Sequence, residues 1–137
     1  MGGFGNGQKL ANAQILTIYE SYKAMLGSLT IKNSGLPLKY NPVALNNDPT
    51  IPATTIFPPK GGLPTHIDIH RRFYDLSPTA RNRVVAHELG HFAVQLRGEP
   101  AGYFNGKNWF KGQQKLPQPT TPQLLTSPDA YAWFLFE

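Results

Sequence analysis

The segment LSPTARNRVVAHELGHFAVQLRGEP, residues 76–100, is the best-specified element of the chain, and the rest of the fold must be arranged around it. Ser77 is a favourable N-cap, and Pro78 suits the first helical position. Gly98 ends the helix, and Pro100 prevents its continuation. The segment therefore predicts a long amphipathic helix. Its apolar stripe, spaced i, i+4, i+7 and i+11, consists of Val85, Leu89, Phe92 and Leu96.

Other segments predict shorter elements. Residues 8–26 have apolar side chains at helical spacing, and Gly27 follows as a stop. Residues 54–57 and 65–70 are typical of strands, whereas residues 28–40 form two strand-like runs around a turn at 33–35. In the last segment, Ser127 and Pro128 repeat the helix-start signal. The intervening residues 41–64 and 99–126 are expected to be mostly irregular. Together these elements predict an α+β fold with a small mixed sheet.

Length and composition limit the possible architectures and sites. A chain of 137 residues fits one domain, expected over residues 8–137, after a flexible start or linker remnant at 1–7. Its 13 Gly and 13 Pro predict short elements and many loops. Because there is no cysteine, disulfides and thiolate metal sites are excluded. Any metal must be held by His, Asp or Glu.

Charge and hydrophobicity bear on partners and location. The net charge of +5 is dispersed, which fits either a solvated basic surface or weak attraction to an acidic partner, and argues against a dedicated nucleic-acid patch. No apolar run is long enough to predict a membrane span. The start of the chain does not resemble a secretory signal. The expectation is therefore a cytoplasmic protein, one exported by a signal-less route, or a domain of a longer chain.

Two histidines and a glutamate on the central helix suggest a metal centre. His87 and His91 are one helical turn apart, so both imidazoles point the same way and can share one ion. Glu88 is rotated by about 100° from His87, which places it to act on a water rather than as a third ligand. This H-E-x-x-H pattern encodes two zinc ligands and a general base. The alternative is an ordinary polar helix face.

Catalytic zinc usually has three protein ligands and one open position, so a third ligand is needed. Val94 and Arg97 occupy the positions where the H-x-x-G-x-x-H extension requires glycine and histidine, which excludes that class. Glu99 follows His91 by only eight residues and is expected to lie too close to fold back. Asp129, in the first turn of the last helix, remains as the third ligand. Alternatively, it simply interacts favourably with the helix dipole.

The segments FYDLSPTARNRVVAHELGHF and SPDAYAWF resemble the aspzincin metallopeptidases, the deuterolysin and peptidyl-lysine metalloendopeptidase group. The resemblance covers roughly residues 65–134 and implies a zincin-like fold and zinc-dependent peptide hydrolysis. The family pattern G-T-x-x-D-x-x-Y-G differs here, because the tyrosine comes one residue early and the glycine is missing. The resemblance implies zinc ligands at His87, His91 and Asp129, a base at Glu88, and an oxyanion role for Tyr131.

Two settings are consistent with such a peptidase. Related bacterial domains occur at the C-terminal ends of polymorphic toxins and type VI secretion effectors. That resemblance implies a protein or peptide substrate, a cognate immunity protein, and delivery into a target cell. The sequence AHELGH also resembles the cytoplasmic ImmA/IrrE regulatory proteases, although no glutamate pair precedes AYAWF here. A third possibility, of a different class, is a non-catalytic metal-binding module.

Two further groups of side chains are candidates for the substrate site. His66, Asp68 and His70 share one face of strand 65–70. Either the group binds a metal, or His66 and His70 contact substrate, or the face is simply wet. We expect this strand to be the sheet edge on which an extended substrate adds. The long connection also holds aromatic residues that either wall a cleft or pack beneath the loop. They are Tyr103, Phe104, Trp109 and Phe110.

Overall fold

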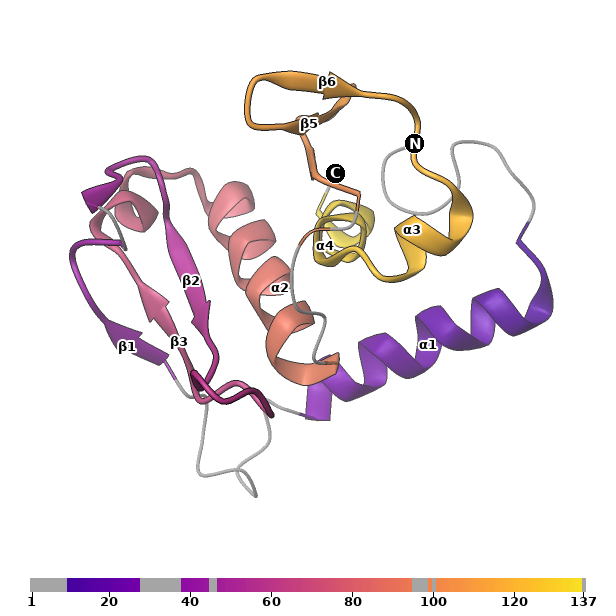
Figure 1. Cartoon of the computed structure of the whole chain (residues 1–137), viewed down its shortest axis with the longest axis horizontal. Coiled ribbons are helices and arrows are strands. Elements are labelled where there is room, and N and C mark those ends of the chain that lie inside the picture. The colour runs from indigo at the N-terminus through magenta and orange to yellow at the C-terminus, as the bar shows by residue number, and fades with distance from the viewer. Residues whose placement is uncertain (1–9, 28–37, 45–46, 95–98, 100, 137) are drawn as a thin grey trace.

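A computed structural model describes residues 10–27, 38–44, 47–94, 99 and 101–136 (Figure 1). These residues form a mixed α+β fold with helices and two small sheets. The α+β class is as the sequence predicts, whereas the second sheet is not predicted. The expected flexible start at 1–7 and most of the strand-like runs at 28–40 lie outside the described residues. The elements are α1 (Asn12–Gly27), β1 (Leu38–Tyr40), β2 (Ala53–Ile56), β3 (His66–Ile69), the 3-10 helix η3 (Arg71–Asp75), α2 (Pro78–Val94), β4 (Tyr103–Phe104), β5 (Trp109–Lys111), β6 (Gln114–Leu116), α3 (Thr121–Leu125) and α4 (Pro128–Leu135).

The first sheet has the strand order β1-β3-β2, with β3 in the centre. β3 runs parallel to β1 and antiparallel to β2, so the sheet is mixed as expected. Asp68 on β3 is opposite Lys39 on one side and Thr54 on the other. The prediction that strand 65–70 is the sheet edge is therefore wrong, because both of its edges are already paired. Within the described residues, β2 is an edge strand.

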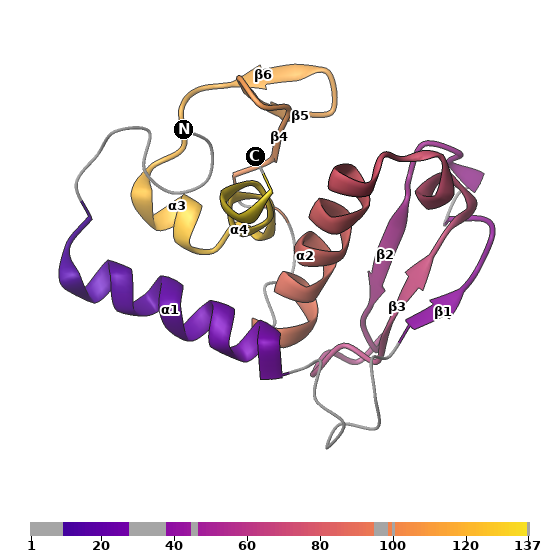
Figure 2. The same ribbon diagram turned by 180° about the vertical axis from the view of Figure 1, so that it is seen from behind.

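Helix α2 is the centre of the molecule. It contacts β2 and β3 on one side and α1 and α4 on the other (Figures 1 and 2). Its start is as predicted, since the Ser77 hydroxyl accepts a hydrogen bond from the Ala80 amide at 3.2 Å. Leu89 is buried, and Val85 is half-buried against the core. The side chains of Phe92 and Leu96, also predicted to belong to the apolar stripe, lie outside the described part.

The first and last helices of the described chain are joined through two tyrosines. The Tyr22 hydroxyl on α1 donates to the Tyr131 carbonyl oxygen on α4 at 2.8 Å, and the two rings meet edge to face. The predicted helix start at residue 8 is too early, since α1 begins at Asn12. The start of α4 is as predicted, with the Ser127 hydroxyl accepting from the Ala130 amide at 3.1 Å. The contact between Tyr22 and Tyr131 therefore holds α1 against α4.

The connection after Glu99 is more regular than the sequence indicates. β4, β5 and β6 form a second, antiparallel sheet, and α3 follows with a capping box between Thr120 and Gln123. Strands of two or three residues are too short to give an alternation pattern, so the sequence reads as loop. The sheet positions Tyr103 against His87 of α2 and the Phe104 amide against Asp129 of α4.

Within the described residues, none of the helices combines the length and hydrophobicity needed to span a bilayer.

Candidate metal centre

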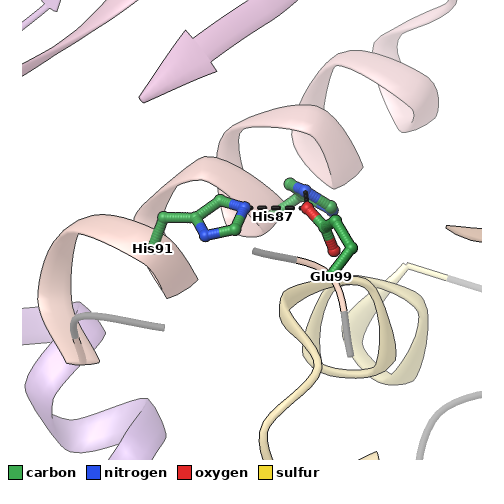
Figure 3. Close-up of side chains that lie close together, drawn as sticks. All are labelled: His87, His91 and Glu99. Carbon is green, nitrogen blue, oxygen red and sulfur yellow. Dashed lines mark hydrogen bonds and ion pairs between the residues drawn. The ribbon is translucent and has the colours of Figure 1, made fainter. Parts of the chain in front are cut away.

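His87 and His91 lie on one side of α2, as their spacing predicts. Both are 8% exposed, and their ring centroids are 5.1 Å apart. One oxygen of Glu99 lies between them: Oε1 is 2.7 Å from His87 Nε2 and 2.8 Å from His91 Nε2 (Figure 3). The Nε2 atoms of two histidines on one helix therefore both approach the same carboxylate oxygen, which comes from outside the helix.

The expectation that Glu99 cannot fold back to the helix is wrong. Glu99 follows His91 by eight positions, and α2 ends at Val94, five positions before Glu99. Five residues of extended chain span roughly 16 Å, more than the width of one helix. The signal available in the sequence was an acid directly after Gly98, because glycine after a helix favours a reversal of the chain.

Asp129 lies on the opposite side of the His87 ring. Its Oδ1 is 2.8 Å from His87 Nδ1, and its Oδ2 accepts a hydrogen bond from the Phe104 amide at 2.6 Å. Both of its oxygens are therefore engaged, and it is not part of the group that converges at the Nε2 atoms. A carboxylate on the second nitrogen of a metal-binding imidazole orients the ring and fixes its tautomer. Whether Asp129 is itself a ligand stays a prediction.

The donor set fits a zinc ion. Ligand atoms of His87, His91 and Glu99 all lie within 4.8 Å of one another. The second carboxylate oxygen of Glu99, Oε2, is buried and has no hydrogen-bond partner among the described residues, so it retains unused ligand capacity. Two imidazoles and one carboxylate are a common protein ligand set for catalytic zinc.

Electrostatics around His87 reflect the two carboxylates. Burial opposes the charge of its ring, but the hydrogen bonds and negative charges of Asp129 and Glu99 raise the pKa of His87 well above 6.5. For Glu99, burial acts to raise the pKa, yet the hydrogen bonds to His87 and His91 lower it below 4.5. A zinc ion would replace the proton that these groups share.

Glu88 faces the same cleft as the histidines. It is 8% exposed, and its Oε2 accepts a hydrogen bond of 2.5 Å from the Thr55 hydroxyl of β2. That hydroxyl also lies 3.1 Å from the Glu88 carbonyl oxygen. The carboxylate is thus fixed in one position beside the two histidines. The cleft has a volume of about 560 Å³, and β2 forms part of its wall.

The two tyrosines near the site lie in different surroundings. Tyr131 is fully buried; its hydroxyl donates to the Leu125 carbonyl oxygen at 2.9 Å and lies 3.0 Å from the Ser21 hydroxyl. Tyr131 is not among the residues that line the cleft, and its oxyanion role stays a prediction. Tyr103 does line the cleft, and its ring stacks on His87 at 5.6 Å. Burial and the nearby carboxylates raise the pKa of Tyr103, which keeps its hydroxyl protonated.

The two histidines of β3 belong to a different part of the molecule. His70 is buried, with Nε2 2.8 Å from the Thr54 hydroxyl and Nδ1 2.7 Å from the Asn41 carbonyl. His66 pairs with Asp68 at 3.0 Å. The expectation of a wet face is wrong, because Asp68 and His70 are buried. Neither histidine is among the residues that line the cleft, and the substrate-binding role stays a prediction.

The aromatic residues of the second sheet divide between the two roles expected for them. Tyr103 lines the cleft, whereas Trp109 is 2% exposed and packs against Phe104, which also contacts Trp133. Packing of this kind holds the strand that carries Tyr103 against α4.

Comparisons with protein-family models, with curated proteins and with solved structures found no match.

Proposed function

We propose that this protein is a zinc-dependent endopeptidase of the zincin type. The observation that carries the proposal is the convergence of one Glu99 oxygen on both histidine Nε2 atoms, at 2.7 and 2.8 Å, beside a buried glutamate in the same cleft. His87, His91 and Glu99 would hold the ion, and Asp129 would orient His87. This arrangement provides ligands, an orienting carboxylate and a separate base.

A zinc ion held there would lower the pKa of a water molecule and polarise a peptide carbonyl. The chain supplies the remaining functions. Glu88 takes a proton from the attacking water and later delivers it to the leaving amine. Thr55 keeps the Glu88 carboxylate in position throughout. The protonated Tyr103 hydroxyl is the nearest candidate to donate a hydrogen bond to the developing oxyanion.

An extended peptide fits along β2. This strand lines the cleft, and among the described residues only its edge toward β3 is paired. A peptide added there would gain main-chain hydrogen bonds, which do not depend on its sequence. We therefore propose β2, residues 53–56, as the edge strand on which the substrate adds, in place of strand 65–70.

The biological setting is proposed from the sequence resemblance alone. An aspzincin-like effector or toxin domain would be delivered by a signal-less route, act on a protein substrate and be neutralised by an immunity protein. A cytoplasmic regulatory protease of the ImmA/IrrE type would use the same chemistry. A non-catalytic metal-binding module would bind zinc without hydrolysis, which the following experiment detects.

The test combines metal analysis with proteolysis. Purified wild-type protein is expected to bind one zinc ion and to cleave casein until a chelator is added. Glu88→Gln should keep the zinc and lose at least 99% of the hydrolysis, since a positioned base contributes about 10²–10⁴-fold. Zinc binding without cleavage by the wild type would favour the binding module, and undiminished cleavage by Glu88→Gln would refute the proposed base.

A second pair of variants separates the two carboxylates. Glu99→Gln removes the proposed third ligand and is expected to weaken zinc binding more than Asp129→Asn. Loss of an outer carboxylate typically costs 10–100-fold in metal affinity. The reverse order would identify Asp129 as the ligand, as the sequence alone indicates.

A further inference from the structure

The wall of the cleft contains a positively charged side chain, that of Arg83. Arg83 is on α2, one turn before His87, and it is the only Lys or Arg among the described residues that line the cleft. Residues four apart on a helix have their side chains on the same face, roughly 6 Å apart. Arg83 and His87 therefore lie on the same face of α2, with Arg83 nearer the start of the helix, and both line the cleft.

The Arg83 side chain is held in place from one side only. Its Nε and Nη2 donate to the Phe136 carbonyl oxygen at 3.0 and 2.6 Å. The guanidinium carbon also lies 3.6 Å from the centre of the Trp133 ring. These contacts fix the plane of the group and occupy one of its edges, while Nη1 makes no hydrogen bond with any described residue. The guanidinium is thus held in one orientation, and its N–H groups on the Nη1 side remain available to a ligand.

Among the described residues, no carboxylate forms an ion pair with Arg83, and Asp129, the acid whose charge acts on it, already binds His87 and the Phe104 amide. Burial lowers the pKa of Arg83, but an arginine side chain remains charged in proteins. A half-buried, oriented and unpaired guanidinium is suited to bind a carboxylate in two-point fashion.

We infer that Arg83 forms a carboxylate-binding subsite of the cleft. The inference rests on the proposed peptidase function and assigns it a substrate class. An extended peptide advances about 3.3 Å per residue. A substrate carboxylate bound by Arg83 therefore belongs to a residue one or two positions from the cleaved bond. The carboxylate is either an Asp or Glu side chain or the free C-terminus of a short peptide, and both present the same chemistry.

The test uses peptides that differ only at the two positions on each side of the cleaved bond. Each position carries Glu, Gln or Lys in turn, and kcat/KM is measured for every peptide. At one position the wild type should prefer Glu over Gln by about 10-fold or more, as expected for a charge-assisted hydrogen bond. A free C-terminal carboxylate compared with its amide distinguishes a terminal from a side-chain source.

Variants assign this preference to the residue. Arg83→Gln should bring the Glu-to-Gln ratio close to one, and Arg83→Lys should retain part of it because the charge remains. Arg72→Gln removes the same charge from an arginine that does not line the cleft, and it should keep the full ratio. The wild-type comparison needs no variant, so it tests the subsite even if Arg83→Gln does not fold. Equal rates for all peptides, or a preference for Lys, would overturn the inference.

A binding measurement separates this inference from the proposed function. Fluorescence anisotropy of the labelled Glu and Gln peptides is recorded with zinc-loaded Glu88→Gln protein, which turns nothing over. If the wild type cleaves no peptide but the Glu peptide binds at least 10-fold more tightly through Arg83, the peptidase proposal fails and the subsite stands. If peptides are cleaved without any charge preference, the subsite fails and the peptidase proposal stands.

Discussion

His87 is bound on both of its ring nitrogens. Asp129 holds Nδ1, while Nε2 faces Glu99. The ring orientation is therefore fixed before any ion arrives, which reduces the cost of assembling the site. The sequence alone assigns one carboxylate, Asp129, to this site, whereas the structure has two. Glu99 lies where the Nε2 atoms of the two histidines converge, and Asp129 binds Nδ1 on the other side of the His87 ring.

Thr55 is a residue whose role the sequence does not indicate. Its hydroxyl holds the proposed base, so Thr55→Val should lower kcat by about 10-fold while changing KM little, because the loss concerns the orientation of Glu88. Steady-state kinetics on a casein-derived peptide measure both constants. Thr55→Ser keeps the hydroxyl and is the matched control, expected to retain most of the activity. An equal loss in both variants would mean that packing, not the hydrogen bond, is responsible.

The shared proton between His87 and Glu99 predicts how the metal-free protein responds to pH. The raised pKa of His87 contributes stability that is present below pH 6.5 and lost as pH rises through the folded-state pKa. The lowered pKa of Glu99 contributes stability present above pH 4.5 and lost as pH falls. With chelator present, the free energy of unfolding should therefore decline above pH 6.5 in urea titrations. His87→Gln should show a weaker decline, and an increase in the wild type would contradict the assignment.

At the scale of elements, the helices could be predicted best because their signals are local. Ser77 and Ser127 cap α2 and α4 as expected, since a cap needs only a hydroxyl and the next few amides. The order of strands could not be predicted in this way. That β3 is central and β2 is at an edge depends on pairing between distant segments, and β1 has only three residues.

The second sheet depends on glycine at one tight point. Gly102 has φ +79°, and a Cβ there would lie 2.5 Å from the Phe110 carbonyl oxygen and 2.8 Å from Leu116. Gly102→Ala should lower the free energy of unfolding by about 3 kcal/mol, combining backbone strain with overpacking. Chemical denaturation measures this loss. Because Tyr103 follows directly, its stacking on His87 should be disturbed as well.

Gly112→Ala is the matched control for this substitution. Gly112 also has positive φ, at +62°, but a Cβ there would meet open space. Only the backbone strain of alanine at positive φ remains, so the free energy of unfolding should fall by about 1 kcal/mol. Equal losses in the two variants would show that the close approach at Gly102 contributes nothing.

At the scale of the molecule, α2 lies between the first sheet and the two helices α1 and α4 (Figure 1). The sheet contributes Thr55 to the site, α4 contributes Asp129, and the segment after α2 contributes Glu99. That His87, His91 and Glu88 lie at one cleft could be predicted, because all three are on one helix. The sequence could not decide between Glu99 and Asp129 as the third group at the histidines, because the distance of each from α2 depends on how the whole chain folds.

This convergence predicts that zinc stabilises the whole fold. At a free zinc concentration 100 times Kd, binding to the folded state alone adds about 2.7 kcal/mol, which for a domain of this size raises Tm by about 10 °C. Differential scanning calorimetry with zinc, with magnesium and with chelator measures the shift. Magnesium prefers oxygen ligands and should leave Tm unchanged. His87→Asn combined with His91→Asn should abolish the zinc shift. An equal shift in that variant would mean that zinc binds elsewhere, and no shift in the wild type would mean that the converging side chains do not form a metal site.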